Sequence, residues 1–282
     1  MNTSPTTVAF QGVLGAYSHQ ACREAFPDAK AIACHTFEGV IAAVKNGKAD
    51  IAMLPVENST YGRVADIHSL LPDSGLHIVG EHFVRVHINL MAKKGVKLED
   101  IKTAMSHTVL LGQCRKFLKD HDIAPIAGAD TAGSAQAVAI SDTIDMGALA
   151  SEMAADIYGL DVLAHHIEDN HHNTTRFLVM SPEQNFPDNG NDEFITTFVF
   201  RVRNIPAALY KAMGGFATNG INMVKLESYM VEGSFTATQF YADVIGHPED
   251  PALKRALEEL EYFTDNLDIL GVYKTDVFRQ TA

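Results

Sequence analysis

The chain has 282 residues, of which 22 are Lys or Arg and 35 are Asp or Glu, so its formal net charge is −13. Apolar residues make up 46% and charged residues 20%, which is typical of a globular protein and excludes a disordered or fibrous chain. The negative charge argues against binding to nucleic acid or to an anionic membrane, and the length suggests about two domains.

Short strands and helices alternate in the N-terminal part of the chain. Alternation of this kind is typical of a parallel sheet with helices on its faces. The patterns predict strands at 8–11, 32–34 and 50–56, and helices at 18–26 and 37–46 with Ser18 and Thr36 as their N-caps.

The segment 76–92 has a different pattern. Val84, Val86, Ile88 and Leu90 alternate with polar residues, which indicates an extended chain over a length unusual for one strand. We expect this segment to carry the chain from one lobe to another. A second α/β series follows, with strands near Ala104 and at 123–126, 146–148, 162–164 and 176–180, and helices at 108–119, 134–140 and 151–158.

Residues 181–192 are rich in Pro, Asn, Asp and Gly and are predicted to form a linker. A compact unit follows, with the order strand–helix–strand–strand–helix–strand that is typical of ferredoxin-like folds. Its predicted elements are strands at 194–202, 221–231, 234–246 and 267–275, helices at 205–218 and 251–263, and a hairpin turn at Glu232 and Gly233.

Polar side chains follow the buried strand at 50–56. In open α/β sheets ligands bind at the carboxyl ends of the strands, so Glu57, Asn58 and Ser59 are candidate ligand-binding residues. The same residues could equally form a turn and a helix cap. Near the next strand, Ser106 or Thr108 would cap a helix, and a cap is the favoured interpretation of that pattern.

The polar loop 169–175 runs into the apolar strand at 176–180. Arg176 is a fork-shaped cation suited to binding a carboxylate, and a structural ion pair with Glu57 or Asp169 is an equal alternative. Two histidine pairs, at 165–166 and 171–172, suggest a metal site, but no i,i+4 zinc motif is present. The glycine-rich segment at 12–18 matches no phosphate loop. We therefore expect neither a metal nor a nucleotide cofactor.

Three cysteines, Cys22, Cys34 and Cys114, are too few for a disulfide framework and suggest buried thiols in a reducing compartment. Residues 1–7 lack the features of a signal peptide, and no apolar run approaches the roughly 20 residues of a membrane helix. These observations predict a cytoplasmic protein that does not associate with membranes.

The chain resembles the monofunctional prephenate dehydratases that carry a C-terminal ACT regulatory domain. The resemblance rests on segments that occur in order along nearly the whole length. They are Phe10-Gln11-Gly12 with Gly15-Ala16-Tyr17-Ser18, residues 50–59 with Gly62 and Val64, Ser106-His107 with Gln113-Cys114, Thr131-Ala132 with Ser134-Ala135, residues 148–160, and Ile167-Glu168-Asp169 with Asn173 and Thr175-Arg176-Phe177.

The resemblance implies a fold and an activity. The fold is an α/β bilobal catalytic domain at 1–181, similar to type II periplasmic binding proteins, with lobes at about 1–79 plus 167–181 and at 80–166, followed by an α+β ACT domain at 193–282. The activity is conversion of prephenate to phenylpyruvate, water and CO2 in L-phenylalanine biosynthesis, without a cofactor. The implied catalytic residues are Thr175, as donor to the leaving hydroxyl, with Asn58, Ser106 and Gln113; the implied substrate-binding residues are Glu57, Ser59, Thr131, Arg176 and Phe177.

The resemblance also implies a homodimer or homotetramer assembled through the ACT domain, with L-phenylalanine as an allosteric ligand. Two segments depart from the family pattern: its Gly-Ala-Leu reads Ala207-Ala208-Leu209 here, and its Glu-Ser-Arg-Pro reads Glu227-Ser228-Tyr229-Met230. We therefore expect weaker phenylalanine binding than the family pattern implies. The implied regulatory residues are Ala207, Ala208, Leu209, Asn222, Glu227 and Ser228.

Two alternatives stay open at this point. An arogenate or cyclohexadienyl dehydratase would use the same residues on a substrate with an amino group in place of a keto oxygen. A non-catalytic amino-acid sensor would use the cleft and the C-terminal unit only to bind ligands, although the intact Thr175-Arg176-Phe177 segment with Asn58 and Ser106 argues against it.

Overall fold

Two β-sheets organise the chain in the computed structural model, which describes residues 5–230 and 237–280. The larger sheet contains β1 (Thr7–Gln11), β2 (Lys30–Cys34), β3 (Ile51–Asn58), β4 (Gly62–Arg63), β5 (His77–Arg85), β11 (Thr174–Ser181), β12 (Phe194–Val202), β13 (Met223–Met230), β14 (Ala237–Ile245) and β15 (Thr264–Lys274). The smaller sheet contains β6 (Asn89–Ala92), β7 (Thr103–Ser106), β8 (Ala124–Ala127), β9 (Met146–Ala150) and β10 (Asp161–Ala164).

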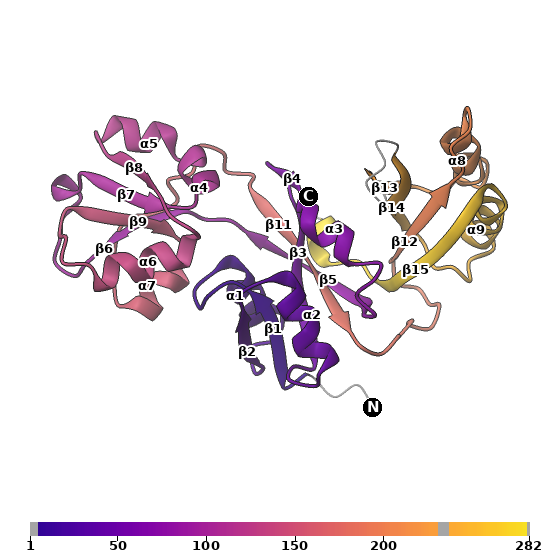
Figure 1. The fold of residues 1–282 in the computed structure, drawn as a ribbon, viewed down its shortest axis with the longest axis horizontal. Coiled ribbons are helices and arrows are strands. Elements are labelled where there is room, and N and C mark those ends of the chain that lie inside the picture. Colours follow the sequence, from indigo (N-terminus) through magenta and orange to yellow (C-terminus); the bar gives the residue numbers. More distant parts are fainter. Residues whose placement is uncertain (1–4, 231–236, 281–282) are drawn as a thin grey trace.

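The two sheets make up three bodies, because the larger sheet spans two of them. The larger sheet runs β13-β14-β12-β15-β5-β11-β3-β1-β2, with β4 beside β3, and the smaller sheet runs β10-β6-β9-β7-β8. Figure 1 shows the smaller sheet on the left, β1 to β3 in the centre and β12 to β15 on the right. We call the left body the distal lobe, the central body the proximal lobe and the right body the C-terminal unit.

Helices cover both faces of the proximal lobe. Helix α1 (Tyr17–Ala25) packs on one face with Phe10 and Phe177, and α2 (Phe37–Lys45) and α3 (Ala65–Leu70) pack on the other with Leu54 and Leu178. Strand β1 is parallel to both β2 and β3, as alternating strands and helices predict. Thr36 caps α2 as expected, since its hydroxyl accepts a hydrogen bond from the amide of Gly39.

The segment 76–92 crosses between the sheets as expected. It forms β5 in the larger sheet and β6 in the smaller one, and the chain returns through β11, which pairs with β5 in antiparallel fashion. The distal lobe carries α4 (Thr108–Gln113), α5 (Arg115–Asp120), α6 (Thr131–Ile140) and α7 (Glu152–Tyr158).

Three local predictions about helix ends were wrong. Ser18 lies inside α1, whose N-cap is Ala16 with no side-chain hydrogen bond. The predicted helix at 108–119 is two short helices that meet at Cys114. Neither Ser106 nor Thr108 caps α4, because His107 holds the N-cap position and its Nδ1 accepts from the amide of Val109.

The C-terminal unit has the predicted order of elements, with α8 (Ala208–Thr218) and α9 (Pro251–Phe263) on one face of its strands. The other face contributes Val199 and Tyr241 to the same apolar cluster as α2 and α3. Strand β15 pairs with β5 at Gly271 and Ile78, where a Cβ on residue 271 would collide with the carbonyl oxygen of Ile78. The predicted hairpin turn at residues 232–233 lies outside the described residues.

In the part of the chain that the structure describes, no helix is long and apolar enough to cross a membrane. All three cysteines are free thiols, and Cys22 and Cys114 are buried. Burial raises the pKa of Cys22 to about 12, so this thiol is a packing group rather than a nucleophile.

Candidate active site

A cavity of about 340 Å³ lies between the proximal and distal lobes. Its size is in the range of small-molecule sites. Residues from the turn after β1 and from α1 form one wall, and the start of α6 with the residue before α4 forms the other. The polar side chains that line it are Gln11, Tyr17, Ser18, His35, His107, Asp130 and Thr131.

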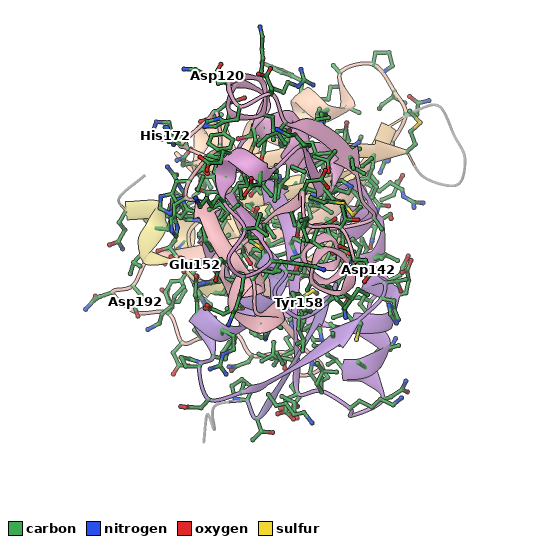
Figure 2. The ribbon with its side chains drawn as sticks, turned by 90° about the vertical axis from the view of Figure 1, so that its left-hand side faces the viewer. Asp120, Asp142, Glu152, Tyr158, His172 and Asp192 are labelled. Carbon is green, nitrogen blue, oxygen red and sulfur yellow. The ribbon has the colours of Figure 1, made fainter. Side chains whose placement is uncertain are left out.

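Gly15 brings the two lobes into direct contact beside this cavity. Its carbonyl oxygen accepts a 2.6 Å hydrogen bond from Ser151, the N-cap of α7. Gly15 has φ of +89°, and a Cβ there would lie 2.9 Å from the Cα of Ala154, so only glycine fits. Tyr158, at the other end of α7, donates to the carbonyl of Leu14 at 2.8 Å. Figure 2 looks onto the distal lobe and labels Tyr158 there.

A chain of side-chain hydrogen bonds also joins the lobes. Asn58 donates through Nδ2 to the hydroxyl of Thr175 at 2.9 Å and to Oδ1 of Asn173 at 2.6 Å. Asn173 in turn donates to Oε1 of Gln113, at the end of α4, at 3.0 Å. Tyr17, which lines the cavity, packs against the apolar cluster that contains Cys114, the residue after Gln113. Asn58, Gln113, Asn173 and Thr175 are themselves not among the residues that line the cavity.

A β-bulge places Asn58 and Thr175 on the same face. Strand β3 pairs Glu57 with Arg176 and Pro55 with Phe177, so Val56 is an extra residue. Without the bulge, Asn58 would share the face of Leu54 and Val56, which pack toward α2 and α3. Because a bulge switches the alternation of a strand, Asn58 turns to the face of Thr175.

The hydrogen bonds around Asn58 also fix the role of the Thr175 hydroxyl. Oδ1 of Asn58 accepts from the backbone amides of Thr60 and Tyr61 at 2.9 and 3.0 Å, so Nδ2 must be the donor to Thr175. The Thr175 oxygen therefore accepts from Asn58, and its hydrogen is left to donate to another group. This polarity is what a donor to a leaving hydroxyl requires.

Arg176 lies on the opposite face of β11, and the prediction that it binds a substrate carboxylate does not fit its position. Its side chain is 2% exposed and is surrounded by Glu57, Glu81, Asp243 and the hydroxyl of Tyr273, at 2.6 to 2.8 Å. The geometry matches the structural alternative, an ion pair with Glu57. Burial would lower the pKa of Arg176, but the surrounding acidic groups, Asp243 first, raise it well above its usual range.

Glu57 is equally occupied. It accepts hydrogen bonds from Arg176 and from Lys225 of the C-terminal unit. Burial would raise the pKa of Glu57, but Arg176 and Lys225 outweigh burial and lower it. Glu57 is therefore ionised and paired away from the cavity, and its predicted contact with substrate is not part of this arrangement.

The other predicted site residues do not come together at one place. Thr131 lines the cavity. Ser59 ties β3 to the loop before β11, because its hydroxyl donates to the carbonyl of His172 and accepts from the amide of Thr174. Ser106 is fully buried and donates to the carbonyl of Leu149, and Phe177 packs in the core beside α1.

Sequence reasoning missed Asn173 as a site residue, although it lies only two residues before Thr175. It is 2% exposed and bridges Asn58 and Gln113. A polar side chain just before a buried strand is common in loops, so no local signal distinguished Asn173 from its neighbours.

The histidine pairs lie at and near the crossing between the lobes. The rings of His87 and His166 stack at 4.0 Å, and Nδ1 of His87 lies 3.1 Å from Glu168. Glu168 also accepts from the amide of Ile88. No group of three His, Cys, Asp or Glu side chains with metal-binding geometry occurs within residues 5–230 and 237–280. The hydroxyl of Tyr17, a partly buried residue, donates to the carbonyl of His87 at 2.7 Å, and desolvation raises the pKa of Tyr17 well above its usual range.

A second cavity, of about 290 Å³, lies in the C-terminal unit at the start of α8. Ala207, Ala208 and Leu209 line it together with Arg203 and Phe240. The predicted regulatory residues Asn222, Glu227 and Ser228 are not part of its wall. Glu227 and Ser228 instead contact Arg63 of the proximal lobe, and the carbonyl of Asn222 accepts from Ile245.

Two α/β bodies that enclose a polar cavity and are joined by two crossing segments define a bilobal fold similar to type II periplasmic binding proteins. A family model described as prephenate dehydratase matches residues 8–185. The chain therefore belongs to the prephenate dehydratase family. It is 49% identical over 97% of its length to a bifunctional N-acyl-homoserine lactone acylase/prephenate dehydratase of Komagataeibacter europaeus, and covers 97% of that protein.

Further relatives include two named as dehydratases and one structure with a different description. Arogenate dehydratase/prephenate dehydratase 1 of Arabidopsis thaliana is 38% identical over 98% of this chain, which covers 74% of that protein. The solved prephenate dehydratase of Arthrobacter aurescens in complex with L-Phe is 30% identical, with a TM-score of 0.87 over 95% of this chain and 90% of that chain. A structure described as a novel type of quorum quenching acylase is 49% identical, with a TM-score of 0.92 over 97% of this chain and 99% of that chain.

Proposed function

We propose that the chain converts prephenate to phenylpyruvate, water and CO2 in L-phenylalanine biosynthesis. Prephenate carries two carboxylates and a ring hydroxyl. The bond to the ring carboxylate breaks, its electron pair enters the ring, and the hydroxyl leaves as water with one proton taken up. Because an aromatic ring forms, much of the driving force resides in the substrate, and the enzyme needs mainly alignment and a donor to the leaving group.

The single observation that carries the chemical proposal is the polarity of the Asn58–Thr175 hydrogen bond. Asn58 donates to Thr175, so the threonine hydroxyl keeps its hydrogen for the leaving hydroxyl of the substrate. Gln113 and Asn173 extend the hydrogen-bonded chain to the distal lobe. The distal lobe is therefore connected to the Thr175 hydroxyl through side-chain hydrogen bonds.

The cavity wall supplies neutral donors for the two carboxylates. Gln11, Ser18 and Thr131 can each donate one or more hydrogen bonds. His107 accepts through Nδ1 from the amide of Val109, so its Nε2 carries the hydrogen in the neutral ring and can donate. Among the described residues that line the cavity there is no Lys or Arg. Substrate attraction then depends on these local donors, against the net charge of −13.

We also propose that residues 1–181 act as the catalytic domain and residues 193–282 as an ACT regulatory domain that binds L-phenylalanine. The cavity at Ala207, Ala208 and Leu209 lies at the N-terminal end of α8, where backbone N–H groups favour a carboxylate. The Arthrobacter aurescens relative in complex with L-Phe supports this ligand. Ala207 has φ of +60°, a backbone conformation that suits glycine better than alanine. The alanine that stands here in place of the family's glycine therefore strains the start of α8.

A homodimer or homotetramer through the C-terminal unit is part of the proposal. Strand β13 is the last strand of the larger sheet, and its outward residues Val224, Leu226 and Met230 are 40%, 41% and 60% exposed. An exposed apolar edge strand is a surface that a second copy can cover. We place the enzyme in the cytoplasm, where small-molecule biosynthesis proceeds and free thiols persist.

Two alternatives remain for comparison in the assay. Arogenate differs from prephenate by one amino group, and several relatives bear the name arogenate dehydratase. The acylase named for the Komagataeibacter europaeus relative would need a nucleophile activated by a base. Ser18 and Thr131, the serine and the threonine of the cavity wall, make no hydrogen bond to a histidine in the described part of the chain, so the geometry favours dehydration.

The test compares three substrates with one protein preparation. Phenylpyruvate formation from prephenate, phenylalanine formation from arogenate, and release of homoserine lactone from an acylated lactone are measured under matched conditions. We expect prephenate to have the highest kcat/KM. Faster turnover of arogenate would assign the alternative dehydratase, and turnover of the lactone alone would overturn the proposal. Binding of L-phenylalanine, titrated by calorimetry, tests the regulatory part separately.

A further inference from the structure

A buried ionic cluster lies between the proximal lobe and the C-terminal unit, on the face of β11 opposite Thr175. Arg176 is its centre. The guanidinium donates through Nε to Glu81 on β5 at 2.7 Å, through Nη1 to Glu57 on β3 at 2.8 Å, and through Nη2 to Tyr273 on β15 at 2.7 Å. Nη1 also donates to Asp243 on β14 at 2.6 Å. Four strands thus hold one side chain.

The charges of this cluster balance. Arg176, Lys225 and Arg279 face Glu57, Glu81 and Asp243, and the side chains of Glu81 and Asp243 are both 0% exposed. Removing one partner from such a cluster leaves an uncompensated buried charge, which strongly favours rearrangement of the remaining charged side chains. The position of Arg176 is therefore set by all of its acceptors together.

Of the three carboxylates that accept from Arg176, Asp243 is the one that belongs to the C-terminal unit. Its Oδ1 accepts from the hydroxyl of Thr197 at 2.6 Å, and Thr197 also contacts the hydroxyl of Tyr273 at 2.8 Å. These contacts anchor Asp243 within the sheet of the C-terminal unit. They give Arg176 a fixed acceptor on that side, whereas Glu57 is shared with Lys225 and is 30% exposed.

The ionic cluster and the Asn58–Thr175 pair lie on opposite faces of the larger sheet. Glu57 and Asn58 are adjacent on β3, and Arg176 and Thr175 are adjacent on β11 and directly opposite them. The pair Glu57–Arg176 faces the C-terminal unit and the pair Asn58–Thr175 faces the other way. A displacement of Arg176 acts on the backbone of its neighbour Thr175. The bulge at Val56 interrupts the β3 ladder next to this pair, whereas β5 keeps its regular pairing with both residues.

We propose that Asp243 is a positioning residue for the dehydratase site: it fixes Arg176, and through the Glu57–Arg176 pair it holds the Asn58–Thr175 pair in its reactive geometry. This inference rests on the proposed function, in which Thr175 contacts the substrate. It assigns to the C-terminal unit a part in the dehydration step itself, independent of any regulatory ligand.

The test uses Asp243→Asn in the full chain. The amide keeps the size of the carboxylate and can still accept from Thr197, but it no longer compensates the Arg176 charge. We expect kcat for prephenate to fall about 10-fold with KM changed less than about 2-fold, because small misplacements of a catalytic group act on the transition state. We also expect faster amide hydrogen exchange in peptides that cover residues 53–60 and 172–178.

Two further variants keep the test decisive. Tyr273→Phe removes the acceptor of Nη2 and the contact with Thr197 but no charge, and it should lower kcat about 3-fold, so it stands in if Asp243→Asn does not fold. Asp265→Asn is the matched control, because it removes an exposed ion pair with Arg203 in the same unit, and it should leave both kcat and exchange unchanged.

The proposal would be overturned if both Asp243→Asn and Tyr273→Phe had the wild-type kcat per folded molecule and unchanged amide hydrogen exchange in the two peptides. A loss of activity that follows only the fraction of folded protein would overturn it as well. If the wild-type protein does not turn over prephenate at all, the proposed function fails in that same assay. The hydrogen exchange of residues 53–60 and 172–178 then decides the positioning role by itself.

Discussion

Asn58 donates a 2.9 Å hydrogen bond to the hydroxyl of Thr175, and the two backbone amides bound to its Oδ1 prevent the reverse orientation. Replacing Asn58 with Asp keeps the size and the acceptor for those amides, but it turns the donor into an acceptor. Thr175 would then donate to residue 58 and lose its free hydrogen.

We expect Asn58→Asp to lower kcat for prephenate by roughly 10²-fold. Steady-state kinetics of the purified variant measure this directly. Asn46→Asp, the same change at the exposed C-cap of α2, is the matched control and should retain full activity. A fully active Asn58→Asp protein would show that the direction of this hydrogen bond is unimportant.

Arg176→Lys tests the structural role of Arg176. One ammonium cannot replace a fork that serves four acceptors, so we expect a loss of about 2–3 kcal/mol in the free energy of unfolding, measured in urea. Arg203→Lys, in an exposed pair with Asp265, should cost less than about 0.5 kcal/mol. A raised KM with unchanged stability would instead show that Arg176 binds the substrate.

Gly15→Ala tests the contact between the lobes. Gly15 and Gly47 both have positive φ, +89° and +67°, but a Cβ meets Ala154 only at position 15 and nothing within 4 Å at position 47. Gly47→Ala should therefore cost about 1 kcal/mol of unfolding free energy from backbone conformation alone. Gly15→Ala should cost at least about 1 kcal/mol more, with a loss of activity. Equal losses of unfolding free energy in the two variants would show that the lobes are not in close contact at Gly15.

Ala207→Gly tests the strained start of α8. Because Ala207 has φ of +60°, glycine should raise the unfolding free energy by up to about 1 kcal/mol and tighten L-phenylalanine binding several-fold, to be measured by calorimetry. Ala217→Gly, at an exposed position inside the same helix, should have the opposite effect on stability, a loss of about 1 kcal/mol. Weaker phenylalanine binding in Ala207→Gly would contradict the inference that alanine at this position weakens the ligand site.

His68→Phe tests a buried histidine beside Tyr241. Neither ring nitrogen of His68 has a hydrogen-bond partner within the described residues, and the two rings meet edge to face at 4.9 Å. Burial, followed by the charge of Lys225, lowers the pKa of His68 from 6.5 to about 4. The unfolded chain binds a proton more readily, so the folded state loses up to about 3 kcal/mol as the pH falls from 6.5 toward 4.

Urea unfolding at pH 7.5 and at pH 5 measures this effect. His68→Phe keeps the ring contact and cannot be protonated, so it should unfold with a smaller loss between the two pH values than the wild type. An identical pH dependence in both proteins would show that other groups carry the acid sensitivity.

Much of the fold follows from the sequence because apolar periodicity and turn residues are local signals. The crossing at 76–92, the strand at Phe194–Val202 and the helix at Pro251–Phe263 were all predicted. The end of the helix at Cys114 was not predicted, because residues 108–119 contain no proline and the single Gly112 does not by itself end a helix. The N-cap at His107 was missed because serine and threonine are the usual caps.

The site was only partly predictable for a physical reason. The burial of Arg176 depends on Asp243 and Tyr273, which approach from distant strands and share no local pattern with it. The bulge at Val56 likewise depends on pairing with β11. Asn58 was a candidate from its place after a buried strand, and the catalytic roles of Asn58 and Thr175 were inferred from a family resemblance. Their hydrogen bond is a property of the folded chain.

The hydroxyl of Thr175 is the centre of this account, and the kcat of two variants on prephenate tests it most directly. Thr175→Ser keeps a hydroxyl that can accept from Asn58 and donate to the leaving group, whereas Thr175→Ala removes it. We predict that the alanine variant loses roughly 10²-fold or more in kcat with a smaller change in KM, while the serine variant keeps most of the activity. An alanine variant with wild-type kcat would contradict the assignment of Thr175 as the donor.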